Sequence, residues 1–139
     1  MTLETHPSAH ATRRVRPRLI ALTATGAIAL LIGGLTLTPA VTPPSMGLAL
    51  TDKVYHLIAF ASLVFPAAII LTSRLVALAL AAFFYGGAIE AIQPLVGRAA
   101  ELADLAANTG GIAIGIALGW ALRTVYRARR LKPPASPDA

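Results

Sequence analysis

The chain has 139 residues, of which 56% are hydrophobic and only 13% are charged, whereas a soluble domain carries about 25% charged residues. The apolar residues form long runs without the polar face that a water-soluble helix needs, and this excludes a soluble globular domain. The net charge is +6, but the basic residues flank apolar runs as in membrane proteins, so we expect no nucleic-acid partner. The absence of cysteine excludes a disulfide framework and a thiol nucleophile.

Four apolar segments are each long enough to cross a hydrocarbon core of about 30 Å. We therefore expect an all-α membrane bundle of four transmembrane helices, with the lipid bilayer as its main partner. The expected spans are residues 19–38, 54–72, 75–92 and 105–122. Pro66 lies inside the second span and is expected to kink it. The second and third spans are separated by Ser73 and Arg74 alone, which predicts a tight antiparallel hairpin.

The first span is expected to remain in the mature protein. Its apolar run of about 20 residues exceeds the roughly 7–15 residues of a signal-peptide core. The cleavage-like sequence that ends at Ala40 is weak, so an uncleaved helix is the favoured interpretation.

The positions of Lys and Arg predict the orientation in the membrane. With the N-terminus in the cytoplasm, only Lys53 and Arg98 of the 12 basic residues fall outside, which leaves 12 − 2 = 10 inside. Both termini are therefore expected to be cytoplasmic. The predicted organisation is a basic N-terminal tail over residues 1–18, a transmembrane domain over 19–122, and a basic, proline-containing tail over 123–139.

In this orientation the few polar residues of three spans meet near the outer surface. The predicted polar cluster consists of Asp52, Lys53, His56, Glu90, Gln93, Arg98, Asp104 and Asn108. Ionisable residues inside a membrane cost roughly 2.5–3.5 kcal/mol at a helix centre, so these groups should face the bundle interior and pair. Arg98 is the expected cationic partner of the carboxylates and Lys53 the second choice, whereas Glu101 is expected to be a solvated loop charge.

Part of this cluster also has a purely structural interpretation. Asp52 and Asp104 both stand at predicted helix N-termini, where a carboxylate caps free N–H groups and interacts favourably with the helix dipole. The sequence leaves open whether these two residues bind a ligand or only cap helices.

Glycines repeat every four residues along the fourth span, at Gly111, Gly115 and Gly119. A ridge of small residues at this spacing lets another helix approach closely. Gly86 and Gly87 on the third span are expected to face the ridge, and all five glycines are assigned to helix packing.

The ordered polar residues resemble the pattern of one family. A D-K-x-x-H start of one helix, an E-x-x-Q helix end, and an R…D…N-x-x-G start of the last helix are typical of VanZ-like membrane proteins. In this chain these motifs correspond to Asp52, Lys53, His56, Glu90, Gln93, Arg98, Asp104, Asn108 and Gly111. The resemblance covers residues 51–122. It implies a multi-pass protein of the bacterial cell membrane, in a family whose founding member is associated with low-level resistance to the glycopeptide teicoplanin.

Three functions remain open at this point. The first is binding of a cell-envelope molecule by the polar cluster: a glycopeptide, a lipid-linked glycolipid precursor or a lipid headgroup. The second is an intramembrane enzyme acting on a lipid-linked substrate, with His56 and Glu90 as candidate acid–base residues. The third is a small transporter, ranked last because Glu90 is expected near the outer end and not at the midplane. Asp52, His56, Glu90 and Asp104 include metal-ligand types, but their spacing lacks the precision of a zinc motif, so we expect neither a metal nor a cofactor.

Overall fold

The computed structural model describes residues 9–38 and 51–131. Within these ranges it contains four α-helices, one short 3-10 helix and no strand, which confirms the predicted all-α class. The elements are α1 (Ala9–Leu37), α2 (Thr51–Ile70), α3 (Leu75–Ile92), η1 (Gln93–Val96) and α4 (Leu102–Leu131). Each of the four α-helices contains a segment long and apolar enough to cross a membrane.

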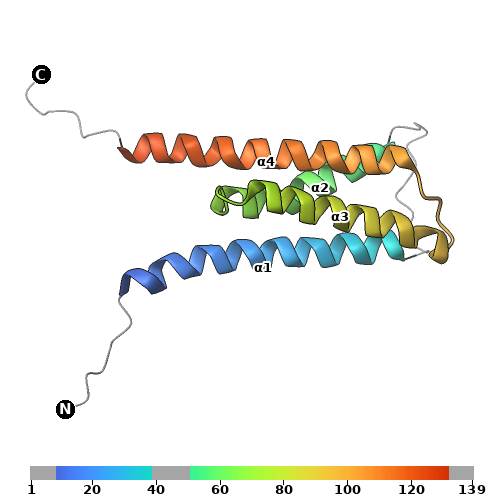
Figure 1. Ribbon diagram of the computed structural model, residues 1–139, viewed down its shortest axis with the longest axis horizontal. Helices are drawn as coiled ribbons and strands as arrows, with labels where there is room; N and C mark the ends of the chain where they lie inside the picture. Colours follow the sequence, from blue (N-terminus) through green and yellow to red (C-terminus); the bar gives the residue numbers. More distant parts are fainter. Residues whose placement is uncertain (1–8, 39–50, 132–139) are drawn as a thin grey trace, which may run out of the picture.

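The helices run back and forth along one axis (Figure 1). The last turn of α1, the first turn of α2, the last turn of α3 and the first turn of α4 lie together; we call this the polar end of the bundle. The first turns of α1 and α3 and the last turns of α2 and α4 lie toward the opposite side, which we call the arginine end. The main packing is between α2 and α4, and α1 packs against α2.

Three helices differ in length from the predicted spans. Ala9 begins α1 and Leu131 ends α4, so both helices continue into the residues expected as tails. Arginine is a good helix former, and a helix that continues past the apolar span keeps its backbone groups hydrogen-bonded. Because α2 ends at Ile70, the hairpin to α3 uses residues 71–74 and is longer than the two residues expected.

The glycine ridge of α4 packs against α2, and not against α3 as expected. A Cβ atom on Gly111 would collide with the backbone carbonyl oxygen of Leu57, and one on Gly115 would lie 2.6 Å from the side chain of Val64. For Gly119 the nearest atom would be a methyl group of α2 at 2.8 Å. The ridge therefore allows α2 and α4 to approach more closely than any other residue type would permit.

The two glycines of α3 have different surroundings. A Cβ atom on Gly86 would lie 3.0 Å from the ring of Phe60 and 3.2 Å from Nδ2 of Asn108, so this glycine faces α2 and α4. A Cβ atom on Gly87 would have no neighbour within 4 Å among the described residues, so the expectation that Gly87 faces the ridge of α4 is wrong. Adjacent helical residues point about 100° apart, so only one of the two can face the bundle.

The buried apolar core is small, and much apolar surface is exposed. The core cluster consists of Ile32, Phe60, Leu63, Val64, Ala82, Ile89 and Ile112. By contrast, Leu30 is 80% exposed and Val76 is 74% exposed. In water such a surface would be a liability, but in a bilayer lipid chains cover it.

Candidate functional site

In residues 16–38 and 51–131, whose side chains the structure describes, every buried polar or charged side chain apart from hydroxyl groups lies at the polar end. These side chains are His56, Glu90, Gln93, Asp104 and Asn108, each at most 8% exposed. All five belong to the polar cluster predicted from the sequence. They come from α2, α3, η1 and α4, so the fold brings together residues that are up to 52 positions apart in the chain.

Lys53 is the cation at the centre of this cluster. Its Nζ atom lies 2.6 Å from Oε2 of Glu101 and 3.8 Å from Oδ2 of Asp52, and it forms a still closer ion pair with Oδ1 of Asp104. The expectation that Arg98 would be the main partner of the carboxylates is therefore wrong. The close packing of α4 on α2 places the start of α4 beside the first turn of α2. Asp104 on α4 therefore lies within reach of Lys53 on α2.

Glu101 is a partner in the ion cluster and not merely a solvated loop charge. Its side chain is 52% exposed, but its carboxylate accepts a hydrogen bond from Lys53. This hydrogen bond and the positive charge of Lys53 lower the pKa of Glu101 below its usual value. The loop before α4 is thereby tied to the start of α2.

Arg98 contacts α1 and not the carboxylates. Its Nη1 atom donates a hydrogen bond to the backbone carbonyl oxygen of Thr36, with a length of 3.3 Å. Carbonyl groups in the last turn of a helix lack partners within the helix, and a cation there interacts favourably with the helix dipole. Arg98 therefore joins the segment after η1 to the end of α1 and has further N–H donors available.

His56 is held between an amide and two carboxylates. Its Nδ1 atom lies 3.0 Å from Oδ1 of Asn108, and its Nε2 atom lies 3.8 Å from Asp104 and 4.0 Å from Asp52. A carbonyl oxygen only accepts hydrogen bonds, so the contact with Asn108 is a hydrogen bond when Nδ1 carries a proton. The amide fixes the orientation of the ring, and Nε2 remains directed at the carboxylates.

Several buried polar atoms of the cluster lack a hydrogen-bond partner within the described residues. They are Oε1 of Glu90, Oε1 of Gln93 and Nδ2 of Asn108. The other carboxylate oxygen of Glu90 accepts a hydrogen bond from the backbone N–H of Glu101 at 3.3 Å. Buried polar groups are almost always paired with protein or water, so these three atoms can take part in further hydrogen bonds.

One subset of the cluster has the composition of a metal site. Asp52, His56 and Asp104 each offer a ligand atom, and these atoms lie within 4.8 Å of one another. However, the ammonium group of Lys53 pairs with both aspartates, and so supplies the positive charge that a metal ion would bring. The arrangement favours an ion-paired network over a metal centre.

A cavity of about 420 Å³ opens beside this cluster, between α1 and α2. Most of its walls are apolar, whereas Asp52, His56 and Arg98 add polar groups at the polar end. The apolar walls are formed by Ile32, Leu35, Tyr55, Ile58, Ala59 and Phe60. The sequence did not indicate this cavity, because one of its walls comes from α1, which carries no polar motif.

Four apolar helices with a buried polar network at one end define this chain as a multi-pass membrane protein. The family model described as VanZ/LLP1 matches residues 3–123, and the chain belongs to this family. The match extends beyond residues 51–122 and includes α1, which lines the cavity. Neither a curated protein nor a solved structure matches the chain.

Proposed function

We propose that the polar end of this VanZ-family membrane protein binds an amphiphilic molecule of the bacterial cell envelope. The observation that supports this most strongly is the cavity between α1 and α2. Its apolar walls suit a hydrocarbon chain, and its polar groups suit a headgroup at the depth of the membrane surface. Binding sites of this kind are mostly apolar, with a few polar groups that fix orientation.

The distribution of positive charge supports an outward-facing polar end. Among the described side chains, the polar end has only Lys53 and Arg98 as cations. The arginine end has Arg16, Arg18, Arg74, Arg123, Arg127, Arg129 and Arg130. Basic flanks remain in the cytoplasm, so the arginine end and both termini are cytoplasmic in this proposal. A ligand at the polar end then comes from the outer leaflet.

The polar groups of the cavity indicate the chemistry of the headgroup. Arg98 donates one of its N–H groups to a backbone carbonyl, and a guanidinium has five N–H donors. The remaining donors suit a phosphate or carboxylate. Asp52, which is partly exposed, accepts hydrogen bonds from hydroxyl or amide groups. A lipid-linked cell-wall precursor combines a hydrocarbon chain, phosphate and such groups.

Binding can be measured with the purified protein in zwitterionic detergent, using an isoprenoid-linked disaccharide precursor as the probe and native mass spectrometry as the readout. The wild-type chain should bind it, and Arg98→Gln should weaken binding about tenfold, the loss expected for a hydrogen bond to a charged group. Arg74→Gln is the matched control, because Arg74 is exposed in the hairpin before α3. Equal binding by the wild-type chain and Arg98→Gln would contradict the proposal. Preferential binding of phosphatidylglycerol that Arg98→Gln weakens and Arg74→Gln does not would identify a lipid headgroup as the ligand of the polar end instead.

A contribution to glycopeptide resistance follows from the family resemblance and is a separate step of the proposal. Expression in a susceptible Gram-positive host should raise tolerance to teicoplanin, and Arg98→Gln should remove the increase while the protein remains in the membrane. Unchanged tolerance with intact precursor binding would reject the resistance role and leave the binding site in place.

An intramembrane enzyme is the second candidate, favoured by the setting of His56. Its ring lines the cavity, is oriented by Asn108 and faces two carboxylates, as a general acid–base would be. Incubation of the protein with the same precursor, followed by mass spectrometry, tests this candidate. A product that forms with the wild-type chain and disappears with His56→Gln would favour the enzyme over the binding protein.

A further inference from the structure

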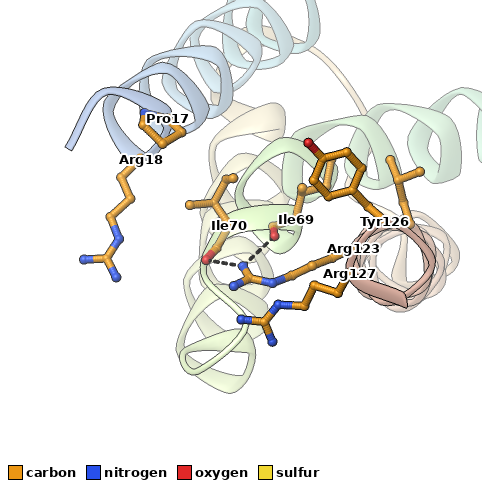
Figure 2. A pocket seen from close by; sticks show the side chains of 8 residues that line it. Pro17, Arg18, Ile69, Ile70, Arg123, Tyr126 and Arg127 are labelled. Carbon is orange, nitrogen blue, oxygen red and sulfur yellow. Dashed lines mark hydrogen bonds between the residues drawn. The ribbon is translucent and has the colours of Figure 1, made fainter. Parts of the chain in front are cut away.

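A second cavity lies at the arginine end of the bundle, about 640 Å³ in volume. Figure 2 shows it between α1, the end of α2 and the last turns of α4. Three arginines line it, Arg18 from α1 and Arg123 and Arg127 from α4, together with the apolar residues Ile69 and Ile70. It shares no residue with the cavity at the polar end, so the inference below is independent of the proposed function.

Arg123 is held in place by the end of α2. Its Nη1 atom donates hydrogen bonds to the carbonyl oxygens of Ile69 and Ile70, both 2.8 Å long (Figure 2). These carbonyls belong to the last turn of the helix, where such groups lack helical partners. The bonds use one nitrogen of the guanidinium, so the N–H groups on its other two nitrogens remain available. A donor fixed in this way loses little freedom when it binds a ligand.

The other two arginines add positive charge at the same cavity. In Figure 2 the guanidinium of Arg127 lies beside that of Arg123, and Arg18 extends from the opposite wall toward the same side. Both side chains are exposed. The carboxylates in residues 9–38 and 51–131 are Asp52, Glu90, Glu101 and Asp104. All four lie at the polar end, so no carboxylate in the described part of the chain balances these three cations.

We propose that this cavity is a binding site for the phosphate headgroup of an anionic phospholipid. Guanidinium groups match phosphate geometry with paired hydrogen bonds, and basic pockets between transmembrane helices are known to hold acidic lipid headgroups. A lipid fits better than a free phosphate because Ile69, Ile70 and Leu122 form apolar walls. The neighbouring surface of α4 is also apolar, with Leu118 56% exposed, and offers a path for an acyl chain.

The test uses the full chain in a zwitterionic detergent, with phosphatidylglycerol, phosphatidylcholine of the same chain length, and inorganic phosphate as separate probes. Native mass spectrometry counts the bound lipid. The wild-type chain should retain phosphatidylglycerol in preference to phosphatidylcholine. Arg18→Gln and Arg127→Gln should each weaken this binding about fivefold, the effect of one basic residue at an anionic membrane surface.

Arg129→Gln is the matched control, because Arg129 is an exposed arginine of the same helix that does not line the cavity. It should leave the affinity unchanged, and Arg127→Lys, which keeps the charge, should lose less than Arg127→Gln. Loss of equal size in Arg129→Gln would show general charge attraction and overturn the site. Equal retention of the two lipids, or displacement of the lipid by inorganic phosphate alone, would overturn the assignment to an anionic phospholipid.

Discussion

The two ends of the bundle both gather charged residues at helix termini, but they compensate the charge in different ways. At the polar end Lys53 pairs with carboxylates from α2, the loop before α4, and α4 itself. At the arginine end Arg123 donates to backbone carbonyls, and its neighbours in the cavity face no described carboxylate. At the polar end carboxylates of the chain compensate the charge of Lys53, whereas the arginine end leaves positive charge for a partner from the membrane.

The two ends compensate charge differently because their charged side chains are buried to different extents. At the polar end Asp104 is 3% exposed, and a buried charge without a partner is strongly destabilising. Exposed arginines beside lipid headgroups need no carboxylate of the chain as a partner, because water and anionic lipids compensate their charge. Stability of the fold should therefore depend on the charges of the polar end far more than on those of the arginine end.

The largest effect is expected from Lys53→Met. This change leaves the buried carboxylate of Asp104 without its cation and should reduce the free energy of unfolding by about 3 kcal/mol. Unfolding in mixed detergent micelles measures the loss. The double variant Lys53→Met/Asp104→Asn should recover part of it, since the unpaired charge is gone. A loss no larger than that of Arg74→Gln would contradict the central place of the ion cluster.

The next largest effect is expected at the glycine ridge. Gly111→Ala should cost about 2 kcal/mol, because the added methyl group would meet the carbonyl oxygen of Leu57. Gly119→Ala should cost less, since its nearest contact is a methyl group. The control is Gly87→Ala, whose added methyl group meets no described atom within 4 Å and should stabilise the helix slightly. Equal costs at Gly111 and Gly87 in the same unfolding assay would refute the close approach of α2 and α4.

A smaller loss is expected from Arg123→Met at the arginine end. The change removes the donor to the last carbonyls of α2, a loss of about 1 kcal/mol because water can replace a partly exposed hydrogen bond. The comparison with Lys53→Met, made in the same detergent, measures the contrast between the two ends directly. A loss from Arg123→Met that exceeds the loss from Lys53→Met would show that stability depends more on the charges of the arginine end than on those of the polar end.

The smallest effect concerns pH and Glu101. The pKa of Glu101 is lowered in the folded protein by Lys53, so its contribution to stability is present above the usual pKa of about 4.3 and is lost as pH falls through the folded value. Wild-type protein should be slightly more stable than Glu101→Gln at about pH 6, and the difference should shrink at about pH 3. A difference that stays constant over this range would exclude the ionised pair as its source.

The sequence predicted most of the residues that gather at the polar end, but it missed Glu101 and did not predict how the residues pair. The four apolar runs and the D-K-x-x-H, E-x-x-Q and N-x-x-G spacings placed His56, Glu90 and Asn108 at one end of the bundle, because helix period and span length determine such positions. Which cation reaches Asp104 depends on the distance between α2 and α4, a tertiary property set by Gly111 and its neighbours. The contact of Arg98 with α1 and the cavity beside it could not be predicted from the sequence, because both depend on the position of α1. This helix carries no polar motif that would indicate its position.

The proposed function requires that the polar end faces away from the cytoplasm, where an envelope ligand can reach it. Because the chain has no cysteine, a single introduced thiol reports its own location. Ala100→Cys lies in the exposed loop before α4, and Ala128→Cys is its exposed counterpart at the arginine end. A membrane-impermeant maleimide should label Ala100→Cys in intact cells and Ala128→Cys only after permeabilisation. The reverse pattern would place the polar end in the cytoplasm and contradict binding of an outer envelope molecule.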